Sequence, residues 1–347
     1  MSELLVRSIE TLAEGHDLSI EEMAAVLAEI MSGNGTEAQI AAVLIALRMK
    51  GETVEELAGL ARTMREFAAH VPAHHEDLLD TAGTGGGRRT FNVSTTAALI
   101  AAGAGCVVAK HGNRSATGLS GSADLLEALG ARIDLNPVAV ARCIDEVGFG
   151  FMYAPAHHPA TRYVIPVRRQ LGVRTTFNFL GPLTNPARAT RQLLGVADPA
   201  HLPKLAGALA LLGTRHALVV CGEDGVDELS ISASTRVIEV RDGSLQEYSV
   251  MPEELALTRH PAEAVPGGDP AENARITRSI LSGEPGAARD LAVLNAGAAV
   301  YAGGGADSLA DGVEVARLAV DSGAAAHKLE EFIALTLELA GPATATS

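Results

Sequence analysis

From residue 78 onward, the chain alternates short apolar runs, several of which end in glycine-rich turns, with alanine-rich stretches of helical spacing. The clearest buried strands are residues 78–81, 107–109 and 217–221, and the clearest helices are residues 94–104 and 123–129. Strands that are separated by helical crossovers form a largely parallel sheet. We therefore predict a large α/β domain with a mostly parallel central sheet flanked by helices.

The chain before that point has helical spacing throughout. Three predicted helices begin with pairs that fit the capping-box spacing, namely Ser19 with Glu22, Thr36 with Gln39 and Thr53 with Glu56. Such pairs satisfy the free amides of a first helical turn. We predict a small all-helical domain at residues 1–72, joined by a segment near residues 165–190, then an α/β domain at residues 73–340 and a flexible tail at residues 341–347. The broad apolar faces of the helical domain should meet the rest of the chain or a second copy.

The charge balance argues against a general nucleic-acid binder. The 347 residues include 27 Lys and Arg against 42 Asp and Glu, a formal net charge of −15. Nonspecific binding to phosphate backbones depends on clustered cations that release counterions. An anionic ligand would therefore need a local cradle.

Cysteine usage and the N-terminal sequence indicate the compartment. Cys106, Cys143 and Cys221 are widely spaced in apolar surroundings, which predicts buried thiols in a reducing environment. The N-terminal segment lacks the basic start and long apolar run of a signal peptide, and no run reaches the roughly 20 apolar residues of a membrane span. We expect a cytoplasmic protein with no membrane partner.

A glycine-rich segment at residues 80–95, DTAGTGGGRRTFNVST, is the strongest chemical signal. Glycines without Cβ atoms let backbone amides surround a phosphate, and a following helix start adds amides and a favourable dipole. A tight turn in which Asn92 or Ser94 caps the helix is the alternative. Arg88 replaces the third glycine of GxGxxG, and no Gly-Lys-Ser/Thr follows, so the loop is neither a dinucleotide nor a Walker site.

A second segment at residues 110–124, KHGNRSATGLSGSAD, directly follows the predicted strand 107–109. Ligands of open α/β sheets gather beyond the carboxyl ends of the strands, so we expect both glycine-rich segments to meet there. Lys110 offers a point charge and Arg114 a planar fork for phosphate oxygens. A solvated loop is the alternative.

A third candidate is the acidic pair Asp227 and Glu228, which follows the predicted strand 217–221. Mg²⁺ prefers one or two carboxylates, with water and phosphate oxygens completing its octahedron. Taken alone, such a pair is more often a solvated turn. Because two phosphate-type loops accompany this pair in the sequence, we interpret Asp227 and Glu228 as a metal site.

The motifs, taken together and in order, resemble those of the anthranilate phosphoribosyltransferases. The matching segments are GTGG with NVST, KHGNR with SGSADLLEALG, APAHHPA, RTTFNFLGPLTNPA and GVDELS, and the resemblance covers nearly the whole chain. It implies a hinge between two domains, a homodimer through the helical domain, and Mg²⁺, with two ions when phosphoribosyl pyrophosphate (PRPP) is bound. The implied reaction joins the amine of anthranilate to C1 of PRPP, giving N-(5-phosphoribosyl)anthranilate and pyrophosphate, in tryptophan biosynthesis.

The resemblance also implies the site residues. The PRPP positions are Gly83, Gly86, Gly87, Thr90, Asn92, Val93, Ser94, Thr95, Lys110, His111, Gly112, Asn113, Arg114 and Ser122. The metal positions are Ser94, Asp227 and Glu228, and the anthranilate positions are Gly83, Asn113 and Arg168, with Pro182 nearby. Lys110, Asp227, Glu228 and Arg168 are the residues expected to carry the reaction.

The glycine-rich loop departs from the family pattern in one place. Most members have GTGGD, whereas here GTGG runs into Gly87, Arg88 and Arg89, with the Asp absent and one residue fewer. Losing a carboxylate beside bound PRPP and metal removes a negative charge. We therefore expect metal demand and PRPP affinity to differ from the usual pattern.

Two other functions share the general plan. A pyrimidine-nucleoside phosphorylase has a similar two-domain plan and phosphate loop, but KHGNR and FNFLGPLTNPA favour the transferase. A noncatalytic nucleic-acid-binding relative is disfavoured by the acidic balance and by the presence of Asp227 and Glu228.

Overall fold

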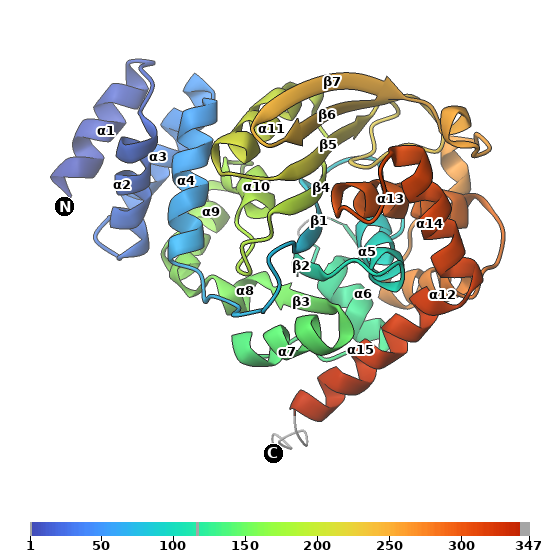
Figure 1. Ribbon diagram of the computed structural model, residues 1–347. Coiled ribbons are helices and arrows are strands. Elements are labelled where there is room, and N and C mark those ends of the chain that lie inside the picture. Colours follow the sequence, from blue (N-terminus) through green and yellow to red (C-terminus); the bar gives the residue numbers. More distant parts are fainter. Residues whose placement is uncertain (1, 116–117, 341–347) are drawn as a thin grey trace.

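The chain begins with a bundle of helices, which is blue in the computed structural model of Figure 1. The structure describes residues 2–115 and 118–340, so the predicted tail at 341–347 lies outside the described residues. The bundle consists of α1 (Glu3–Ala13), α2 (Ile20–Met31), α3 (Glu37–Lys50) and α4 (Val54–Glu66). The three predicted capping boxes are confirmed at the starts of α2, α3 and α4.

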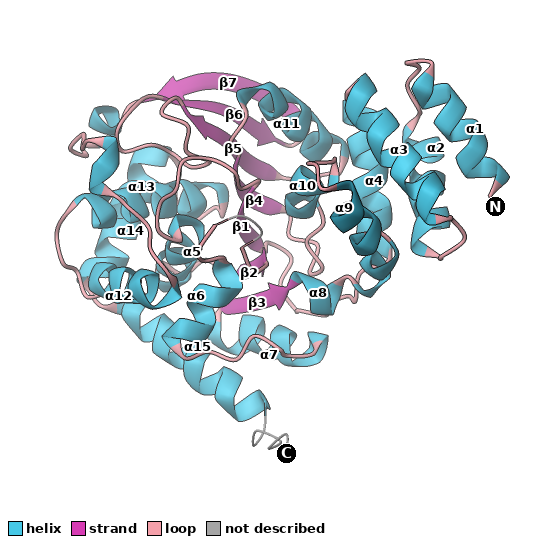
Figure 2. Cartoon of the chain, turned by 180° about the vertical axis from the view of Figure 1, so that it is seen from behind, coloured by secondary structure: helices cyan, strands magenta, loops and turns pink. Residues whose placement is uncertain are grey.

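A seven-stranded sheet forms the centre of the described chain, with the order β3-β2-β1-β4-β5-β6-β7 (Figure 2). Its strands are β1 (Leu79–Gly83), β2 (Val108–Gly112), β3 (Phe149–Tyr153), β4 (Arg191–Gly195), β5 (His216–Gly222), β6 (Thr235–Arg241) and β7 (Ser244–Val250). The pairings from β3 to β5 are parallel, whereas β6 and β7 add two antiparallel pairings. The predicted fold class, with a mostly parallel sheet, is confirmed.

Helices cover both faces of this sheet (Figures 1 and 2). They are α5 (Val93–Gly103), α6 (Ser122–Leu129), α7 (Pro137–Val147), α8 (Ala154–His157), α9 (Ile165–Leu171), α10 (Phe177–Leu180), α11 (Leu202–Leu211), α12 (Pro270–Leu281), α13 (Ala287–Ala302), α14 (Leu309–Asp321) and α15 (Ala324–Ala340). One apolar cluster joins α5, α13, α14 and α15 to one face of the sheet. Another joins α11 to the opposite face of β4, β5 and β6.

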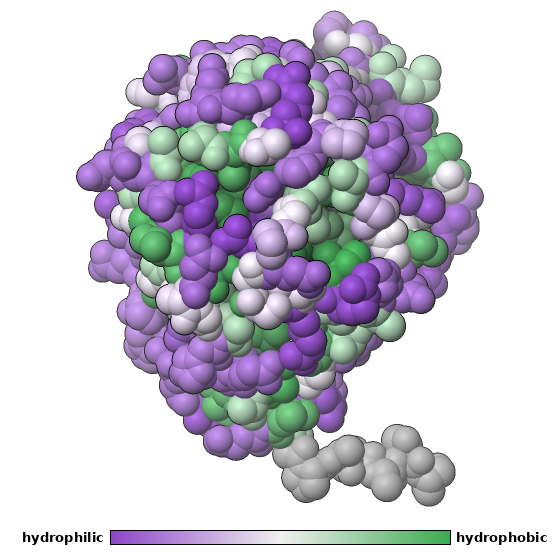
Figure 3. Space-filling model, turned by 90° about the vertical axis from the view of Figure 1, so that its right-hand side faces the viewer, coloured by the Kyte–Doolittle hydropathy of each residue, from purple (hydrophilic) through white to green (hydrophobic). Residues whose placement is uncertain are grey.

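One face of the α/β part is mainly hydrophilic (Figure 3). Figure 3 shows the side that lies at the right of Figure 1, where apolar residues form scattered patches between polar ones. Among the described helices, none combines the length and the apolarity that a membrane crossing requires. All three cysteines are buried and free, as predicted.

The predicted strands and helices are present, with one correction at the second glycine-rich segment. The sequence predicts that Lys110 follows its strand, but β2 continues through Lys110 and His111 to Gly112. The strand is longer because these residues pair in register with Phe151, Met152 and Tyr153 of β3. Lys110 is therefore a strand residue, and its ammonium lies between Thr81 of β1 and Ser94 of α5.

The helical bundle packs on the α/β part through a continuous apolar core. Leu57 and Leu60 of α4 belong to the same buried cluster as Leu205 of α11 and Leu194 of β4. The segment near 165–190 also contributes Val167 and Leu183 to this cluster. The rest of the chain thus covers part of the broad apolar surface that the sequence predicts.

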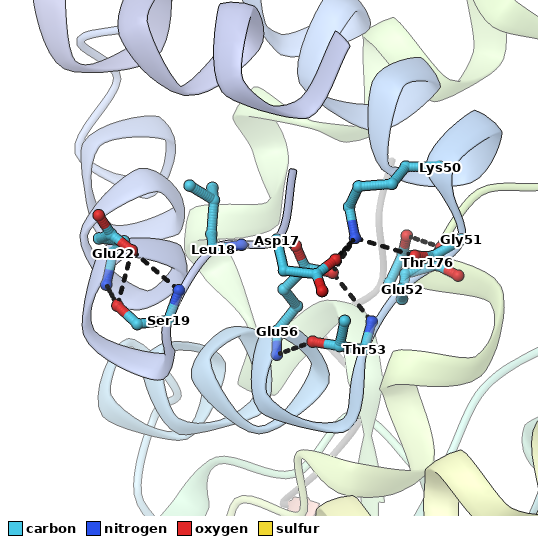
Figure 4. A network of polar contacts seen from close by, with 10 residues as sticks. All are labelled: Asp17, Leu18, Ser19, Glu22, Lys50, Gly51, Glu52, Thr53, Glu56 and Thr176. Carbon is cyan, nitrogen blue, oxygen red and sulfur yellow. Dashed lines mark hydrogen bonds and ion pairs between the residues drawn. The ribbon is translucent and has the colours of Figure 1, made fainter. Parts of the chain in front are cut away.

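A buried ion pair fixes the end of the bundle that faces the α/β part (Figure 4). Glu56 accepts a hydrogen bond from Lys50 at 2.9 Å, and from the backbone amides of Leu18 and Thr53 at 3.0 and 2.9 Å. Lys50 also reaches the exposed Asp17 at 2.6 Å. Because the Glu56 side chain is fully buried, its carboxylate holds the loop before α2 and the end of α3 against the start of α4.

We expect Glu56→Gln to lower the free energy of unfolding by about 3 kcal/mol, because it breaks a buried pair and leaves Lys50 with only the exposed Asp17 as a charged partner. Urea unfolding followed by circular dichroism measures the change. The matched control is Asp17→Asn, which removes an exposed partner of the same lysine and should cost less than about 1 kcal/mol. Equal losses from the two variants would contradict the structural role given to Glu56.

Candidate active site

Three loops meet at the carboxyl edge of the parallel strands. The loop after β1 contacts the loop after β2 where the Ser120 hydroxyl donates to Asn92 Oδ1 at 2.9 Å. It contacts the turn after β5 where the Gly85 amide donates to Asp227 Oδ2 at 2.8 Å. The expectation that both glycine-rich segments lie together is thereby confirmed, and the acidic turn joins them.

Lys110 lies at the centre of this arrangement. Its ammonium donates to the Thr81 carbonyl at 2.5 Å and the Thr81 hydroxyl at 3.2 Å, and lies 3.4 Å from Ser94 Oγ. The residue is only 1% exposed, so the solvated-loop alternative is wrong for Lys110. Burial lowers the pKa of the ammonium to about 8, partly opposed by the negative charges of Asp80 and Glu228.

A buried carboxylate supports the strand that carries Lys110. Asp80 of β1 accepts from the His111 amide at 3.1 Å and from Asn185 Nδ2 at 2.8 Å. Asn185 also donates to the Ala109 carbonyl at 2.8 Å. Burial raises the pKa of Asp80, although the Lys110 charge lowers it. Asp80 thus ties the ends of β1 and β2 together behind Lys110.

Asp227 and Glu228 lie directly against the glycine-rich loop. A Cβ at Gly83 would lie 2.7 Å from Asp227 Oδ2, and one at Gly87 would lie 2.9 Å from Asp227 Oδ1. The Thr90 hydroxyl is 3.5 Å from Glu228 Oε2. The Asp227 carboxylate therefore favours glycine at position 83, and the same carboxylate together with the Gly225 carbonyl favours it at position 87. The solvated-turn alternative is wrong for this pair.

The electrostatics of the pair favour a cation between or beside the two carboxylates. Burial, and then the charge of Asp227, raises the pKa of Glu228 well above its ordinary value, while Thr90, Lys110 and Arg88 lower it. Burial also raises the pKa of Asp227, opposed by the Gly85 amide. Two adjacent carboxylates of this kind are hard oxygen ligands for Mg²⁺.

The donor set fits a substrate-bridged metal better than a closed protein cage. Within residues 2–115 and 118–340, no group of three or more His, Cys, Asp or Glu side chains is arranged to hold a metal ion. Mg²⁺ commonly takes one or two carboxylates and completes its shell with water and substrate phosphates. Asp227 and Glu228 therefore fit this kind of site, and Ser94 of α5, the third predicted metal position, lies 3.4 Å from the Lys110 ammonium.

The start of α5 presents polar groups to the same region. Asn92 at the N-cap makes no side-chain capping bond, so the capping alternative is wrong for this residue. Its Oδ1 instead accepts from Ser120 and from Asn273 Nδ2, the latter at 2.8 Å. Val93 and Thr95 are buried in the first turn, and the hydroxyl of Thr95 has no hydrogen-bond partner among the described residues.

The loop after β2 is held by its own helix α6. Arg114 donates to Asp124 at 2.7 Å and to Glu127 at 2.6 and 2.9 Å. Asn113 Oδ1 accepts from the Arg114 amide, and the Asn113 carbonyl accepts from Ala123 at the start of α6. Ser122 begins α6 and lies beside Gly112. The Arg114 guanidinium is bonded to these two carboxylates, so its predicted contact with phosphate stays a prediction.

Arg168 lies on α9, which packs against α3 of the bundle. Its Nη2 donates to Asn178 Oδ1 at 3.3 Å, and its guanidinium lies 5.5 Å from the centre of the Phe177 ring. Burial lowers its pKa. Among the described residues it has no carboxylate partner, so its planar fork is available for a ligand carboxylate.

Three buried histidines lie behind Lys110. The rings of His111 and His158 are 5.0 Å apart, and the Nε2 atoms of His111, His157 and His158 have no hydrogen-bond partner within the described chain. Burial, followed by the charge of His157, lowers the pKa of His158 to about 4. Burial and the other two imidazoles hold the pKa of His111 well below its ordinary value. The cluster is therefore uncharged at neutral pH.

A cavity of about 390 Å³ opens beside the glycine-rich loop, between that loop and the helical bundle. Thr84 and Gly86 form one wall, and Arg48, Arg174 and Lys204 form part of the others. The Arg174 guanidinium lies over Gly86, where a Cβ would be 2.3 Å from its Nη1. The loop therefore has the bundle and Arg174 on one side and the acidic turn on the other.

Sequence reasoning missed Arg174, Asn273 and His158. Asn273 contacts Asn92 across 181 positions, a separation that no local pattern reveals. Arg174 and His158 lie inside the segments RTTFNFLGPLTNPA and APAHHPA, which carried the resemblance. A paired histidine in an apolar stretch was an available signal for His158.

Comparison with known proteins first gives the class. The chain matches the helical bundle domain of the glycosyl transferase family over residues 6–68. It matches the a/b domain of the glycosyl transferase family over residues 75–326. The chain therefore has the helical bundle domain and the a/b domain of the glycosyl transferase family.

Individual relatives give the particular family. The anthranilate phosphoribosyltransferase of Symbiobacterium thermophilum is 54% identical over 332 residues, covering 95% of this chain and 97% of that protein. The crystal structure of the Thermus thermophilus enzyme has a TM-score of 0.90 at 46% identity, covering 95% and 99% of the two chains. The Saccharomyces cerevisiae enzyme in complex with PRPP and Mg has a TM-score of 0.87 at 29% identity, covering 96% and 98%. The chain belongs to the anthranilate phosphoribosyltransferase family.

The buried histidines predict an acid-sensitive stability. Because the folded-state pKa of His158 lies below the unfolded value, its stabilising effect is full above about pH 6.5 and is lost as the pH falls toward about 4. When the pH falls from about 7 to about 5, the titration of this imidazole alone should lower the free energy of unfolding by about 2 kcal/mol. Urea unfolding at both pH values measures the change.

His158→Gln should remove that part of the pH dependence, because glutamine does not titrate. The matched control is His16→Gln, at a histidine whose side chain is 70% exposed, and it should keep the wild-type pH dependence. If both variants lose stability with acid as the wild type does, His158 is not the group responsible.

Proposed function

We propose that this protein transfers the phosphoribosyl group of PRPP to the amine of anthranilate, giving N-(5-phosphoribosyl)anthranilate and pyrophosphate, in tryptophan biosynthesis. The observation that carries the proposal is the buried Lys110 ammonium between Thr81 and Ser94, within the field of Glu228 and beside the glycine-rich loop. The 54% identity to an anthranilate phosphoribosyltransferase favours this activity over a phosphorylase or a noncatalytic nucleic-acid-binding protein.

The chain's own residues would hold the pyrophosphate half of PRPP. Lys110 supplies a desolvated positive charge, and the loop from Gly83 to Gly87 with the start of α5 supplies backbone amides. Gly86, Thr90, Asn92, Ser94 and Thr95 lie around that loop. Such preorganised charges stabilise the negative charge that develops as the bond from C1 to the pyrophosphate oxygen breaks.

Anthranilate would be held through its carboxylate by Arg168, with Asn113 and Gly83 completing the acceptor site. Its aromatic amine is largely unprotonated near neutral pH, so the nitrogen attacks C1 and then loses its proton without needing a strong general base. The main contribution of the protein is orientation, which is worth several kcal/mol for a two-substrate reaction. A yeast relative was solved in complex with 4-fluoroanthranilate, which supports an anthranilate-type acceptor.

Asp227 and Glu228, with Ser94, would hold Mg²⁺, and we propose two ions when PRPP is bound. Bound Mg²⁺ neutralises the charge of the departing pyrophosphate. The yeast relative in complex with PRPP and Mg supports the use of this metal. Because the loop lacks the Asp of GTGGD, the remaining carboxylates set the metal affinity.

We also propose a domain division at residues 1–72 and 73–340, with 165–190 linking the two, and a homodimer through the helical domain. The matched ranges 6–68 and 75–326 support the division. The exposed Val6 and Met49, at 36% and 83%, support an apolar contact through the bundle. A cytoplasmic location follows from the biosynthetic substrates.

The direct assay follows the loss of anthranilate fluorescence when protein, anthranilate, PRPP and Mg²⁺ are mixed. We expect turnover that requires PRPP and stops on chelation of the metal, because the described residues offer no closed set of ligands for a tightly held ion. Folded protein that consumes no anthranilate across a range of Mg²⁺ concentrations would refute the proposed function. Phosphate-dependent cleavage of thymidine or uridine in its place would favour a phosphorylase.

Lys110→Met should lower kcat/KM for PRPP about 100- to 1,000-fold, because it removes a preorganised charge from the leaving group while keeping an apolar stem of similar length. Steady-state kinetics with varied PRPP measure the loss. Lys328→Met on α15 is the matched control and should keep wild-type kinetics. Wild-type kcat/KM in a folded Lys110→Met protein would show that this lysine does not contact the pyrophosphate.

A further inference from the structure

Arg88 connects the glycine-rich loop to two other segments at once. Its Nη2 donates to Asp224 Oδ2 at 2.8 Å, and its Nη1 donates to the Ala262 carbonyl at 2.6 Å. Its backbone amide donates to the Gly225 carbonyl at 2.6 Å. One residue therefore bonds the loop to the turn after β5 and to the segment before α12.

The turn that Arg88 holds is the one that carries the candidate metal ligands. Asp224 and Gly225 lie three and two residues before Asp227, and Glu228 follows directly. The backbone atoms are already in close contact, since a Cβ at Gly87 would lie 2.8 Å from the Gly225 carbonyl oxygen. A shift of this turn relative to the loop would move both carboxylates relative to the buried ammonium at the centre of the site.

The segment on the other side of Arg88 is equally close. A Cβ at Gly267 would lie 2.0 Å from the Thr90 carbonyl oxygen, and Gly268 donates to Asn273, the residue that contacts Asn92. The glycine-rich loop thus lies between the turn after β5 and the segment before α12. The Arg88 guanidinium bonds to both of them.

The positive charge of Arg88 also lies beside the acidic turn after β5. The turn after β5 places Glu223, Asp224, Asp227 and Glu228 within six positions. The ion pair of Arg88 with Asp224 brings a cation to this acidic group. The Arg88 and Asp224 side chains are 29% and 13% exposed. The partly desolvated guanidinium therefore offsets part of the repulsion among these four carboxylates.

The pair is not built mainly for stability. Arg88 Nε and Asp224 Oδ1 are both buried without a hydrogen-bond partner among the described residues, so the two-bond pairing that arginine and aspartate can make is only half formed. Desolvation of such a pair offsets much of its attraction. Its contribution lies in the relative placement of the loop and the turn.

We propose that Arg88 is a positioning residue that, through Asp224, holds the Asp227–Glu228 turn against the glycine-rich loop and so sets the affinity of the site for PRPP together with Mg²⁺. The inference rests on the proposed function for the identity of this ligand. Arg88 acts through the turn and is not itself a ligand of the metal. Lysine is a poor substitute, because a single ammonium cannot reproduce the planar fork that reaches both Asp224 and the Ala262 carbonyl.

The test compares Arg88→Ala, Asp224→Ala, the double variant and Arg88→Lys with the wild type. We expect Arg88→Ala to raise KM for PRPP and the Mg²⁺ concentration for half-maximal rate about tenfold, while kcat changes less than about twofold. Asp224→Ala should have a similar effect, and the double variant should be little worse than either single one, because the two side chains act as one unit. Arg88→Lys should recover part of the affinity through Asp224.

Calorimetry with Mg²⁺ and inorganic pyrophosphate gives a second measurement that needs no turnover. Arg88→Ala should weaken binding of this probe by a similar factor of about ten. The matched control is Arg142→Ala, which breaks the Arg142–Glu146 pair of 2.6 Å on the surface of α7 and should change neither KM nor probe binding.

The outcomes separate the two proposals. A wild-type protein without turnover refutes the proposed function, whereas an active wild type with unchanged KM and unchanged probe binding in Arg88→Ala refutes the role of Arg88. A variant that loses only thermal stability, or that loses kcat alone, also refutes it. If Arg88→Ala does not fold, the Arg88→Lys and Asp224→Ala variants decide the question by the same two measurements.

Discussion

The burial of the Lys110 ammonium is the constraint on which the rest of the site depends. A cation removed from water needs either a carboxylate or a full set of hydrogen bonds, and here Thr81 and Ser94 supply neutral oxygens. These oxygens satisfy the hydrogen bonds of the ammonium, but among the described residues no carboxylate bonds to it directly, and its charge is balanced only at longer range by Asp80 and Glu228. A site of this kind is completed by an anion, and burial strengthens the attraction because the dielectric is low.

The parallel register of β1 and β2 places that charge. Leu79 is the partner of Val108, so Thr81 lies level with Lys110 on the neighbouring strand. Asp80, which points the other way, bonds the His111 amide and Asn185 and so fixes the two strand ends together. The same register directs one polar side chain to the ligand edge and its neighbour into the supporting core, because side chains alternate along a strand.

Much of this arrangement is readable from local sequence patterns. Capping boxes such as Ser19 with Glu22 are short-range chemistry, and glycine-rich segments indicate close backbone approach, so both are predicted correctly. The approach of Asp227 to Gly83 and Gly87 explains those glycines better than conformational freedom does.

Contacts between residues far apart in the sequence are not predicted by such local patterns. An apolar run that ends in a charged residue places Lys110 beyond its strand, whereas pairing with Phe151 of β3 extends the strand. Arg88 stands out in the sequence only as a departure from a pattern, because its partners Asp224 and Ala262 lie 136 and 174 positions away.

A chain of polar contacts leads from the helical bundle to the glycine-rich loop. Arg48 of α3 donates to the Arg174 carbonyl at 2.7 Å, and Arg174 donates to the Gly85 carbonyl at 3.4 Å. Thr176 donates to the buried Glu52 just after the end of α3, beside the Lys50–Glu56 pair (Figure 4). Any displacement of the bundle therefore acts on the loop at Gly85, while Arg88 fixes the same loop to the acidic turn three residues later. The loop is therefore held on one side by Arg174 and the bundle, and on the other side by the acidic turn.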